Sequence, residues 1–533
     1  MPLGRWHTAE PRTLTAVLDE QVTVRPDQAA LIVGDETLSY GALEAASHAA
    51  ANGLASLGLG HGDCVAIFAN TCPEWLTTWI GAARLGALSV PVNTAYRGEF
   101  LANPLRDSRC KVALVEAALA DRLAAVAEEL PDLETVVILS GDGGTPELPW
   151  PVVEREVLVG SSGRARHRPA RWDEPVAILY TSGTTGESKG AIITHQYLMT
   201  SAATMVASWQ LVEGETLYAP LPLFHISAVA SVAGPLLAGA TGLLDPVFSV
   251  NACWDRVRRY DVAGILLAGV MVNMLWNLPE DPADHELPLR FMSAAPIPRG
   301  LHKALEERYG LKVLTSYGMT EALPMTLYGM EDEAVEGACG RPHPGFEVVV
   351  LDHDDQPVAP GEVGQICCRP TSPHVMFDGY LGKPEVTVER WRNLWFHTGD
   401  LGRMDAEGNL TFVDRNKDVM RRRGENISSF ELEQTLLRHS AVAEVAAVGV
   451  PSDLGEDDVK VVVALRPGAE LPVADLMDFC VERLPYFAVP RYVEFLAELP
   501  KNASGKIVKT DLRAAGVTAA TWDREQVGYV VRR

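Results

Sequence analysis

The stretch YTSGTTGESKG, residues 180–190, follows directly on the apolar run VAILY, residues 176–180. Its glycines at positions 183, 186 and 190 let the backbone pass close to a bound group, and its hydroxyl side chains can donate hydrogen bonds to phosphate oxygens. Lys189 adds a positive charge. Because Gly190 and not Ser or Thr follows Lys189, this is not the GxxxxGK[ST] loop of P-loop NTPases. We predict a phosphate-binding loop of another kind.

The segments before this loop alternate between helical and strand patterns. Residues 40–57 and 74–84 have helical spacing of apolar side chains, and residues 64–68 form a short apolar run between them. This alternation of helices and strands is typical of the βαβ units of an α/β layer. The strand at 176–180 begins a second α/β unit.

After residue 345 the pattern changes to short β segments at 346–351, 364–368 and 410–413. The rest of the chain again has an α/β pattern, with helices at 429–439 and 473–484 and strands at 442–450 and 458–465. We therefore predict a multidomain α/β protein. It has a large N-terminal domain, residues 1–416, with two α/β subdomains and a small β subdomain, and a small mobile α+β C-terminal domain, residues 417–533.

The bulk composition limits the classes of function. A chain of 533 residues is too long for a single hydrophobic core. Its formal net charge of −24 argues against binding to nucleic acid or to an anionic membrane surface. The chain opens without a signal-peptide pattern and has no apolar run long enough to span a membrane, so we expect a cytoplasmic protein.

Four further motifs follow the loop along the chain: SYGMTE at 316–321, WFHTGD at 395–400, DRNKD at 414–418 and PKNASGK at 500–506. With the loop, they resemble in sequence and order the motifs of the adenylate-forming superfamily, whose members include acyl-CoA synthetases and adenylation domains. The resemblance covers nearly the whole chain. It implies an AMP-forming acid ligase that uses ATP and Mg²⁺.

The resemblance assigns roles to individual residues. Glu321 would hold Mg²⁺, Tyr317 would stack on adenine, and Asp400 would accept hydrogen bonds from the ribose hydroxyls. Lys506 would stabilise the charge on the acid and the α-phosphate, with Thr181, Lys189 and Glu321 as the other catalytic residues. The remaining ATP-binding residues that it implies are Ser182, Gly183, Thr184, Thr185, Gly186, Ala295, Pro296, Thr320 and Arg415.

The chain departs from the family pattern at two places. Glu187 and Ser188 stand where the family usually has a small residue or Lys followed by Pro, so the loop has lost a rigid proline. The expected Gly-Ala-Pro of the adenine pocket reads Ala294-Ala295-Pro296. The loop glycines and Lys189 remain, and an active enzyme is still expected.

The segment PLFHIS, residues 222–227, indicates which class of acid the protein activates. Amino-acid-activating relatives carry an Asp at the position of His225, so a free α-amino acid is disfavoured. The strand predicted at 264–270 is apolar, which suits an aryl or small aliphatic acid. The residues predicted to form the acid pocket are His225, Ser227, Gly269, Ala294, Gly318 and Met319.

The segment RRRGENIS, residues 421–428, resembles a loop of carnitine/crotonobetaine-type CoA ligases. There the glycine lies against the channel for the CoA thiol, so Gly424 and Arg421 are the predicted acceptor-channel residues. If this segment is a strand, Arg421 and Arg423 project to one side. Lys417 is the predicted hinge, about which the C-terminal domain would rotate between the two half-reactions.

The resulting hypothesis is an acyl-CoA ligase that binds ATP, Mg²⁺ and an aryl or small aliphatic acid, uses CoA as the acceptor, and acts as a monomer or homodimer. Two alternatives stay open. The first keeps the adenylation chemistry but uses an amine, a carrier-protein thiol, or nitrite activation for diazotisation. The second is a non-catalytic nucleotide sensor on the same fold.

Overall fold

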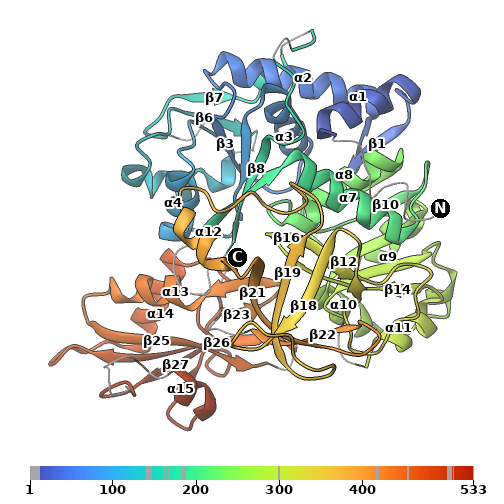
Figure 1. The fold of residues 1–533 in the computed structure, drawn as a ribbon. Coiled ribbons are helices and arrows are strands. Elements are labelled where there is room, and N and C mark those ends of the chain that lie inside the picture. Colours follow the sequence, from blue (N-terminus) through green and yellow to red (C-terminus); the bar gives the residue numbers. More distant parts are fainter. Residues whose placement is uncertain are drawn as a thin grey trace.

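The computed structural model describes residues 12–139, 147–160, 163–165, 168–181, 188–297, 300–415, 419–452, 455–500, 507 and 509–531. Within these ranges it forms two large sheets, several small sheets and a separate C-terminal sheet, as Figure 1 shows. The predicted multidomain α/β fold is confirmed. No helix in the described ranges is long and apolar enough to cross a membrane.

The first seven-stranded sheet contains the strand that leads into the predicted phosphate loop. Its order is β7-β6-β5-β3-β4-β8-β9, parallel except for the antiparallel pair β8–β9 at one edge. The strands are β3 (Cys64–Phe68), β4 (Leu88–Pro91), β5 (Val112–Glu116), β6 (Thr135–Leu139), β7 (Val152–Glu154), β8 (Pro175–Thr181) and β9 (Lys189–Thr194).

The second seven-stranded sheet has the order β14-β13-β12-β10-β11-β1-β2, with β2 as its antiparallel edge strand. The carboxyl ends of its parallel strands β10, β12 and β13 therefore lie at one edge, where open α/β sheets bind their ligands. The strands are β1 (Ala29–Val33), β2 (Glu36–Ser39), β10 (Thr216–Tyr218), β11 (Thr241–Leu244), β12 (Val262–Ala268), β13 (Phe291–Ala295) and β14 (Lys312–Leu314).

One shared core joins the two sheets. Val65 and Ile67 of β3 pack into this core, whereas Ala66 and Phe68 face a second core on the opposite side of the strand. This alternation follows from the two-residue period of a strand whose faces are both covered. The shared core contains α1 (Leu14–Val24), α2 (Tyr40–Ser56), α3 (Pro73–Leu85), α7 (His195–Trp209) and α8 (Ile226–Ala238).

The outer faces of both sheets carry shorter helices. On the first sheet these are α4 (Gly98–Asp107) and α5 (Ala120–Ala124), and α6 (Glu156–Val159) follows β7. On the second they are α9 (Cys253–Arg259), α10 (Gly269–Trp276) and α11 (His302–Tyr309). The helices therefore cover both sheets on both sides.

The predicted β subdomain connects the second sheet to the C-terminal domain, and its strands appear in yellow and orange in Figure 1. It begins at Ser316, earlier than the predicted start at residue 345, and consists of two small sheets and one helix, α12 (Pro384–Arg390). The strands are β15 (Ser316–Met319), β16 (Ala322–Leu327), β17 (Arg341–Pro342), β18 (Phe346–Leu351), β19 (Gly364–Pro370), β20 (Trp391–Arg392), β21 (Trp395–Met404) and β22 (Leu410–Arg415).

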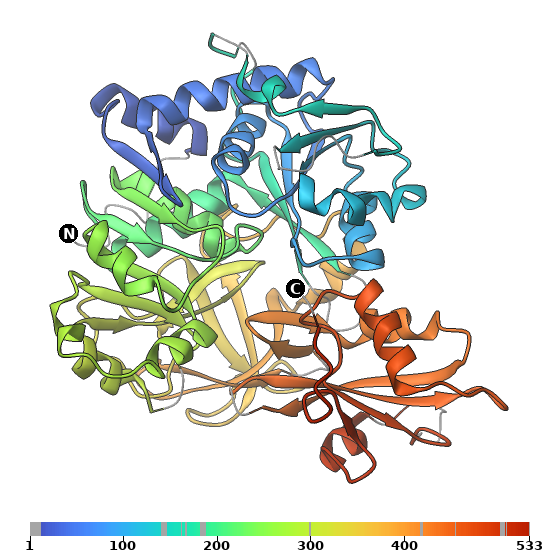
Figure 2. The same ribbon diagram turned by 180° about the vertical axis from the view of Figure 1, so that it is seen from behind.

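The C-terminal domain has its own sheet, β25-β26-β27-β28, and a hairpin, β23–β24. In both views it lies against the large domain, and Phe100 of α4 packs into its core (Figures 1 and 2). Its elements are β23 (Val419–Arg422), β24 (Glu425–Ser428), α13 (Ser429–Leu437), β25 (Val442–Pro451), β26 (Asp457–Leu465), α14 (Val473–Arg483), β27 (Tyr492–Phe495), α15 (Lys509–Ala515) and β28 (Trp522–Asp523).

Two local predictions need correction. The strand expected at 264–270 is β12, which ends at Ala268, and Gly269 begins helix α10. The segment 421–428 is not one strand: residues 423 and 424 form the turn of a hairpin, so Arg423 does not project beside Arg421. In both cases a glycine marks where the chain changes direction. The boundary predicted at 416–417 falls on residues outside the described ranges.

Candidate active site

The strands β8 and β9 flank the predicted phosphate loop. Thr181 is paired with Lys189 across the two strands, and the Thr181 hydroxyl donates a 3.5 Å hydrogen bond to the Lys189 carbonyl. Gly190 is required here, since a Cβ at this position would lie 2.6 Å from the Ile178 side chain. The predicted loop residues Ser182, Gly183, Thr184, Thr185 and Gly186 lie outside the described residues.

Lys189 and Glu321 come together around a third residue, Tyr380. The Lys189 Nζ lies 5.4 Å from the centre of the Tyr380 ring, and the Tyr380 hydroxyl donates to the Glu321 carboxylate at 2.5 Å. Burial lowers the pKa of Lys189, as does Arg390, whereas Glu321 opposes this shift. Burial and the Glu321 charge raise the pKa of Tyr380, so its hydroxyl stays a donor. The three side chains form one polar cluster in the large domain.

Sequence reasoning missed Tyr380. It lies about 60 positions from Glu321 and about 190 from Lys189 along the chain, and it reaches them because its backbone bridges to Ala191 of β9. The local sequence Asp378-Gly379-Tyr380 predicts only a turn. The contact is therefore a result of tertiary structure.

Tyr317 and Asp400, predicted to bind the nucleoside, are in direct contact. The Tyr317 hydroxyl donates to the Asp400 Oδ2 at 2.8 Å, and both side chains are buried. Burial, together with Asp400, raises the pKa of Tyr317, so the phenol remains protonated. Thr320 lies in the β15–β16 turn, where its carbonyl accepts a hydrogen bond from Tyr197 at 3.0 Å. A carboxylate can accept several hydrogen bonds at once, including bonds from hydroxyl groups.

Two of the predicted acid-pocket residues, Gly269 and Ala294, lie at the carboxyl ends of β12 and β13 in the second sheet. Ala268 of β12 is paired with Ala295 of β13, and a Cβ on Gly269 would approach the Pro296 carbonyl to 2.5 Å. Only glycine permits this close approach. The members of the predicted pocket other than Gly269 are placed as follows: His225 and Ser227 at the start of α8, Ala294 buried in β13, and Gly318 and Met319 in β15.

The hairpin β23–β24 of the C-terminal domain reaches this edge of the large domain. Its turn residues Arg423 and Gly424 have φ values of 54° and 80°, as a type I′ turn requires. A Cβ on Gly424 would lie 3.6 Å from Val270, the neighbour of Gly269. The next residue, Glu425, lies 3.6 Å from the His225 Nε2 and accepts a 3.3 Å hydrogen bond from Asn93.

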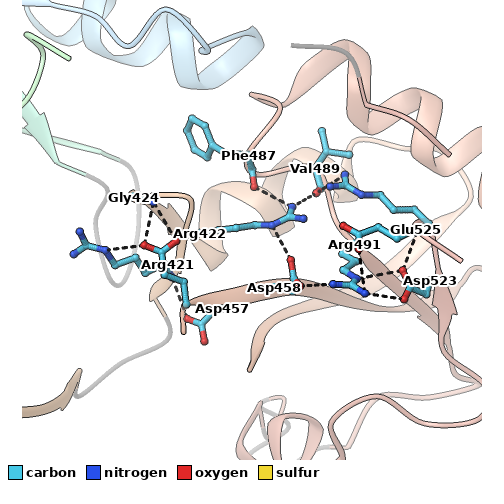
Figure 3. A network of polar contacts seen from close by, with 12 residues as sticks. Arg421, Arg422, Gly424, Asp457, Asp458, Phe487, Val489, Arg491, Asp523 and Glu525 are labelled. Carbon is cyan, nitrogen blue, oxygen red and sulfur yellow. Dashed lines mark hydrogen bonds and ion pairs between the residues drawn. The ribbon is translucent and has the colours of Figure 1, made fainter. Parts of the chain in front are cut away.

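Carboxylates of β26 and the preceding loop hold the turn end of this hairpin, as Figure 3 shows. The Glu456 carboxylate accepts from the Gly424 N–H at 3.1 Å, and Asp457 accepts from the Arg421 N–H at 3.0 Å. The Arg421 side chain lies 3.7 Å from Glu456. The predicted channel residue Arg421 thus faces a carboxylate of its own domain.

Arg422, which sequence reasoning did not single out, anchors the hairpin (Figure 3). Its side chain is 3% exposed, pairs with Asp458 at 2.9 Å and donates to the carbonyls of Phe487 and Val489. Asp458 also pairs with Arg491 at 2.8 Å. Because a buried charge is costly unless paired, this network favours one position for the hairpin on its domain.

Some predicted residues cannot be placed. The predicted catalytic Lys506 and hinge Lys417 lie outside the described residues, as does the side chain of Arg415. Their roles remain predictions.

Comparison with known proteins gives consistent matches over the chain. A family model described as AMP-binding enzyme matches residues 18–381, and one described as AMP-binding enzyme C-terminal domain matches residues 431–506. The crotonobetaine/carnitine–CoA ligase of Salmonella choleraesuis (strain SC-B67) is 30% identical over 519 residues, which cover 94% of this chain and 99% of the relative.

Among solved structures, the chain is similar to the o-succinylbenzoate CoA synthetase of Bacillus subtilis in two states. A double mutant bound to the product analogue OSB-NCoA has a TM-score of 0.80, with 26% identity and coverage of 93% of this chain and 98% of that one. The complex of the synthetase with AMP has a TM-score of 0.66, with 26% identity and coverage of 94% and 98%.

Proposed function

Since the chain belongs to the AMP-binding enzyme family and is an AMP-forming ligase of the acyl-CoA synthetase type, we propose that it activates an aryl or small aliphatic carboxylic acid. The acid reacts with ATP to give acyl-AMP and pyrophosphate, and CoA then displaces AMP. The apolar sequences of β12 and of the start of α10, on either side of the β12 carboxyl end, support this class of acid.

In the first half-reaction the acid's carboxylate oxygen attacks the α-phosphorus, and the bond to pyrophosphate breaks. Residues 181–189 hold the phosphates, with Lys189 supplying positive charge. Asp400 accepts from the ribose hydroxyls, and Lys506 stabilises the charge that gathers where the two anions meet.

Glu321 is the residue that we propose for Mg²⁺. Its buried carboxylate lies beside Lys189 and Tyr380, and a carboxylate with phosphate oxygens is the usual hard-ligand set for this ion. When bound, the ion would neutralise phosphate charge. The Tyr380 hydroxyl orients the Glu321 carboxylate toward its ligand.

In the second half-reaction the CoA thiol loses its proton, its sulfur attacks the acyl carbon, and the C–O bond to AMP breaks. The observation that carries this step is the position of Gly424 against Val270, with Glu425 beside His225. The chain is more similar to the synthetase with a CoA product analogue than to its complex with AMP, with TM-scores of 0.80 and 0.66. We propose that a rotation about Lys417 brings Lys506 to the acid for the first step.

The test is pyrophosphate release measured over a panel of aryl and small aliphatic acids, with and without CoA, and with nitrite plus aryl amines. We expect acid-dependent release and CoA-dependent release of AMP. Release that an amine or nitrite stimulates, while CoA does not, would reject CoA as acceptor. No release with any acid would favour a nucleotide sensor. In the same assay, Glu321→Gln should raise the Mg²⁺ requirement, and an unchanged titration would reject the metal assignment.

A further inference from the structure

Ser188, one of the residues that departs from the family pattern, contacts the C-terminal domain. Its backbone N–H donates to the Glu431 carboxylate at 2.5 Å, and its hydroxyl donates to the same oxygen at 2.6 Å. Ser188 is 1% exposed and Glu431 is 7% exposed. The Ser188 carbonyl accepts from Asn103 at 3.2 Å, which holds this backbone in place. A proline at this position would have neither donor.

Glu431 is presented by the first turn of α13, and this helix packs on α4 of the large domain. Two other contacts link α4 to the C-terminal domain: Phe100 lies in the core of that domain, and Arg438, which follows α13, pairs with Glu99 at 3.1 Å. The Ser188–Glu431 contact therefore exists when the C-terminal domain is docked as in this structure, with Gly424 at the acid site.

The charge of Glu431 conflicts with the ligand proposed for the loop. Hydrogen bonds to a charged acceptor are strong. A buried carboxylate that loses its donors is therefore destabilised by the free energy of those bonds. Phosphate groups bound by residues 181–189 would compete for the Ser188 N–H and would repel the Glu431 carboxylate. Repulsion between like charges is poorly screened at a buried position.

We propose that Ser188 and Glu431 form a phosphate-sensitive latch between the domains. Pyrophosphate in the loop opens the latch, and its departure lets Glu431 take the vacated donors and hold the C-terminal domain in position for the thiol. Ser188 and Glu431 are positioning residues and do not touch the reacting atoms. The latch rests on the proposed function in assigning residues 181–189 to the phosphates.

The experiment measures amide hydrogen exchange in α4 and α13 of the full-length protein, with and without magnesium pyrophosphate. In the unaltered chain, pyrophosphate should speed exchange in both helices about tenfold, because a charged hydrogen bond is comparable in strength to the free energy of a tenfold population change. In Ser188→Pro, exchange should already be fast, and pyrophosphate should add little. Ser188→Ala, which keeps the backbone N–H, should lie between the two.

Glu431→Gln keeps an acceptor but removes the charge, so docking should persist, and the response to pyrophosphate should fall to the part that competition for the Ser188 N–H alone produces. Arg438→Ala is the matched control: it loosens docking at an exposed pair and should keep the pyrophosphate response. The latch is wrong if Glu431→Gln responds as strongly as the unaltered chain, or if bound pyrophosphate leaves exchange unchanged.

Binding of pyrophosphate is measured separately by calorimetry. Absence of binding would reject both the phosphate loop and the latch, whereas binding without a change in exchange would reject the latch alone. The exchange measurement needs no acid, so failure to find a substrate does not affect it.

Discussion

The Glu321–Tyr380 pair and the Glu425–His225 pair both lie at the candidate site, but they depend on different parts of the chain. Both members of the first pair belong to the large domain and are buried, with the hydroxyl 2.5 Å from the carboxylate. In the second pair, Glu425 belongs to the C-terminal domain, and 3.6 Å separates its carboxylate from the His225 ring.

This difference indicates how the site can serve two reactions. The groups of the cluster around Tyr380, which we propose to bind the ATP phosphates and Mg²⁺, belong to the large domain and keep their geometry, as preorganised electrostatic catalysis requires. The groups that we propose to act in one half-reaction are on the C-terminal domain, and the proposed rotation of this domain would break and re-form their contacts with the large domain. The next three predictions test this division of the site.

The largest effect is expected for Lys506→Ala. Loss of the one cation proposed to meet the acid and the α-phosphate should lower pyrophosphate release about 100- to 1000-fold. Transfer from preformed acyl-AMP to CoA should keep its rate. In that step the C-terminal domain is in the position that brings Gly424, and not Lys506, to the acid site. Lys303→Ala, at an exposed position of the large domain, is the control. Equal loss in both half-reactions would contradict a role confined to adenylation.

A smaller effect is expected for Gly424→Val, compared with Gly468→Val. Both glycines have left-handed φ, 80° and 77°, so both variants should lose stability to backbone strain. Only Gly424 has a neighbour from the large domain, since nothing lies within 4 Å of a Cβ on Gly468. Gly424→Val should therefore slow transfer to CoA about tenfold at unchanged pyrophosphate release. If the two variants transfer the acyl group to CoA at equal rates, Gly424 does not line the channel for the thiol.

The smallest effect is expected for Tyr380→Phe, which removes the hydroxyl that orients Glu321 and keeps the ring beneath Lys189. Loss of one hydrogen bond to a charged group should reduce pyrophosphate release roughly threefold to tenfold. Tyr328→Phe is the matched control, because the buried Tyr328 hydroxyl donates to Asn409 at 2.7 Å away from these charges. If Tyr380→Phe and Tyr328→Phe lower pyrophosphate release by the same factor, the Tyr380 hydroxyl does not act through Glu321.

The sequence predicted most elements of the fold well. The strand predicted at 346–351 is β18 with the same bounds, and the helix predicted at 40–57 is α2 to within one residue. These elements have strong periodic patterns of apolar side chains, which local sequence can express. The strand predicted at 264–270 was wrong at its end, because Leu266 to Val270 remain apolar while the backbone turns into α10 at Gly269.

The short motifs predicted the class of reaction, because the spacing of glycines, carboxylates and lysines within each motif is local. Tertiary structure alone decided which groups meet. Tyr380 joins Lys189 to Glu321, and Glu431 reaches Ser188 across 243 positions of the chain. Such contacts depend on sheet order and domain docking, which are set by the burial of large apolar surfaces and leave no pattern at the residues that meet.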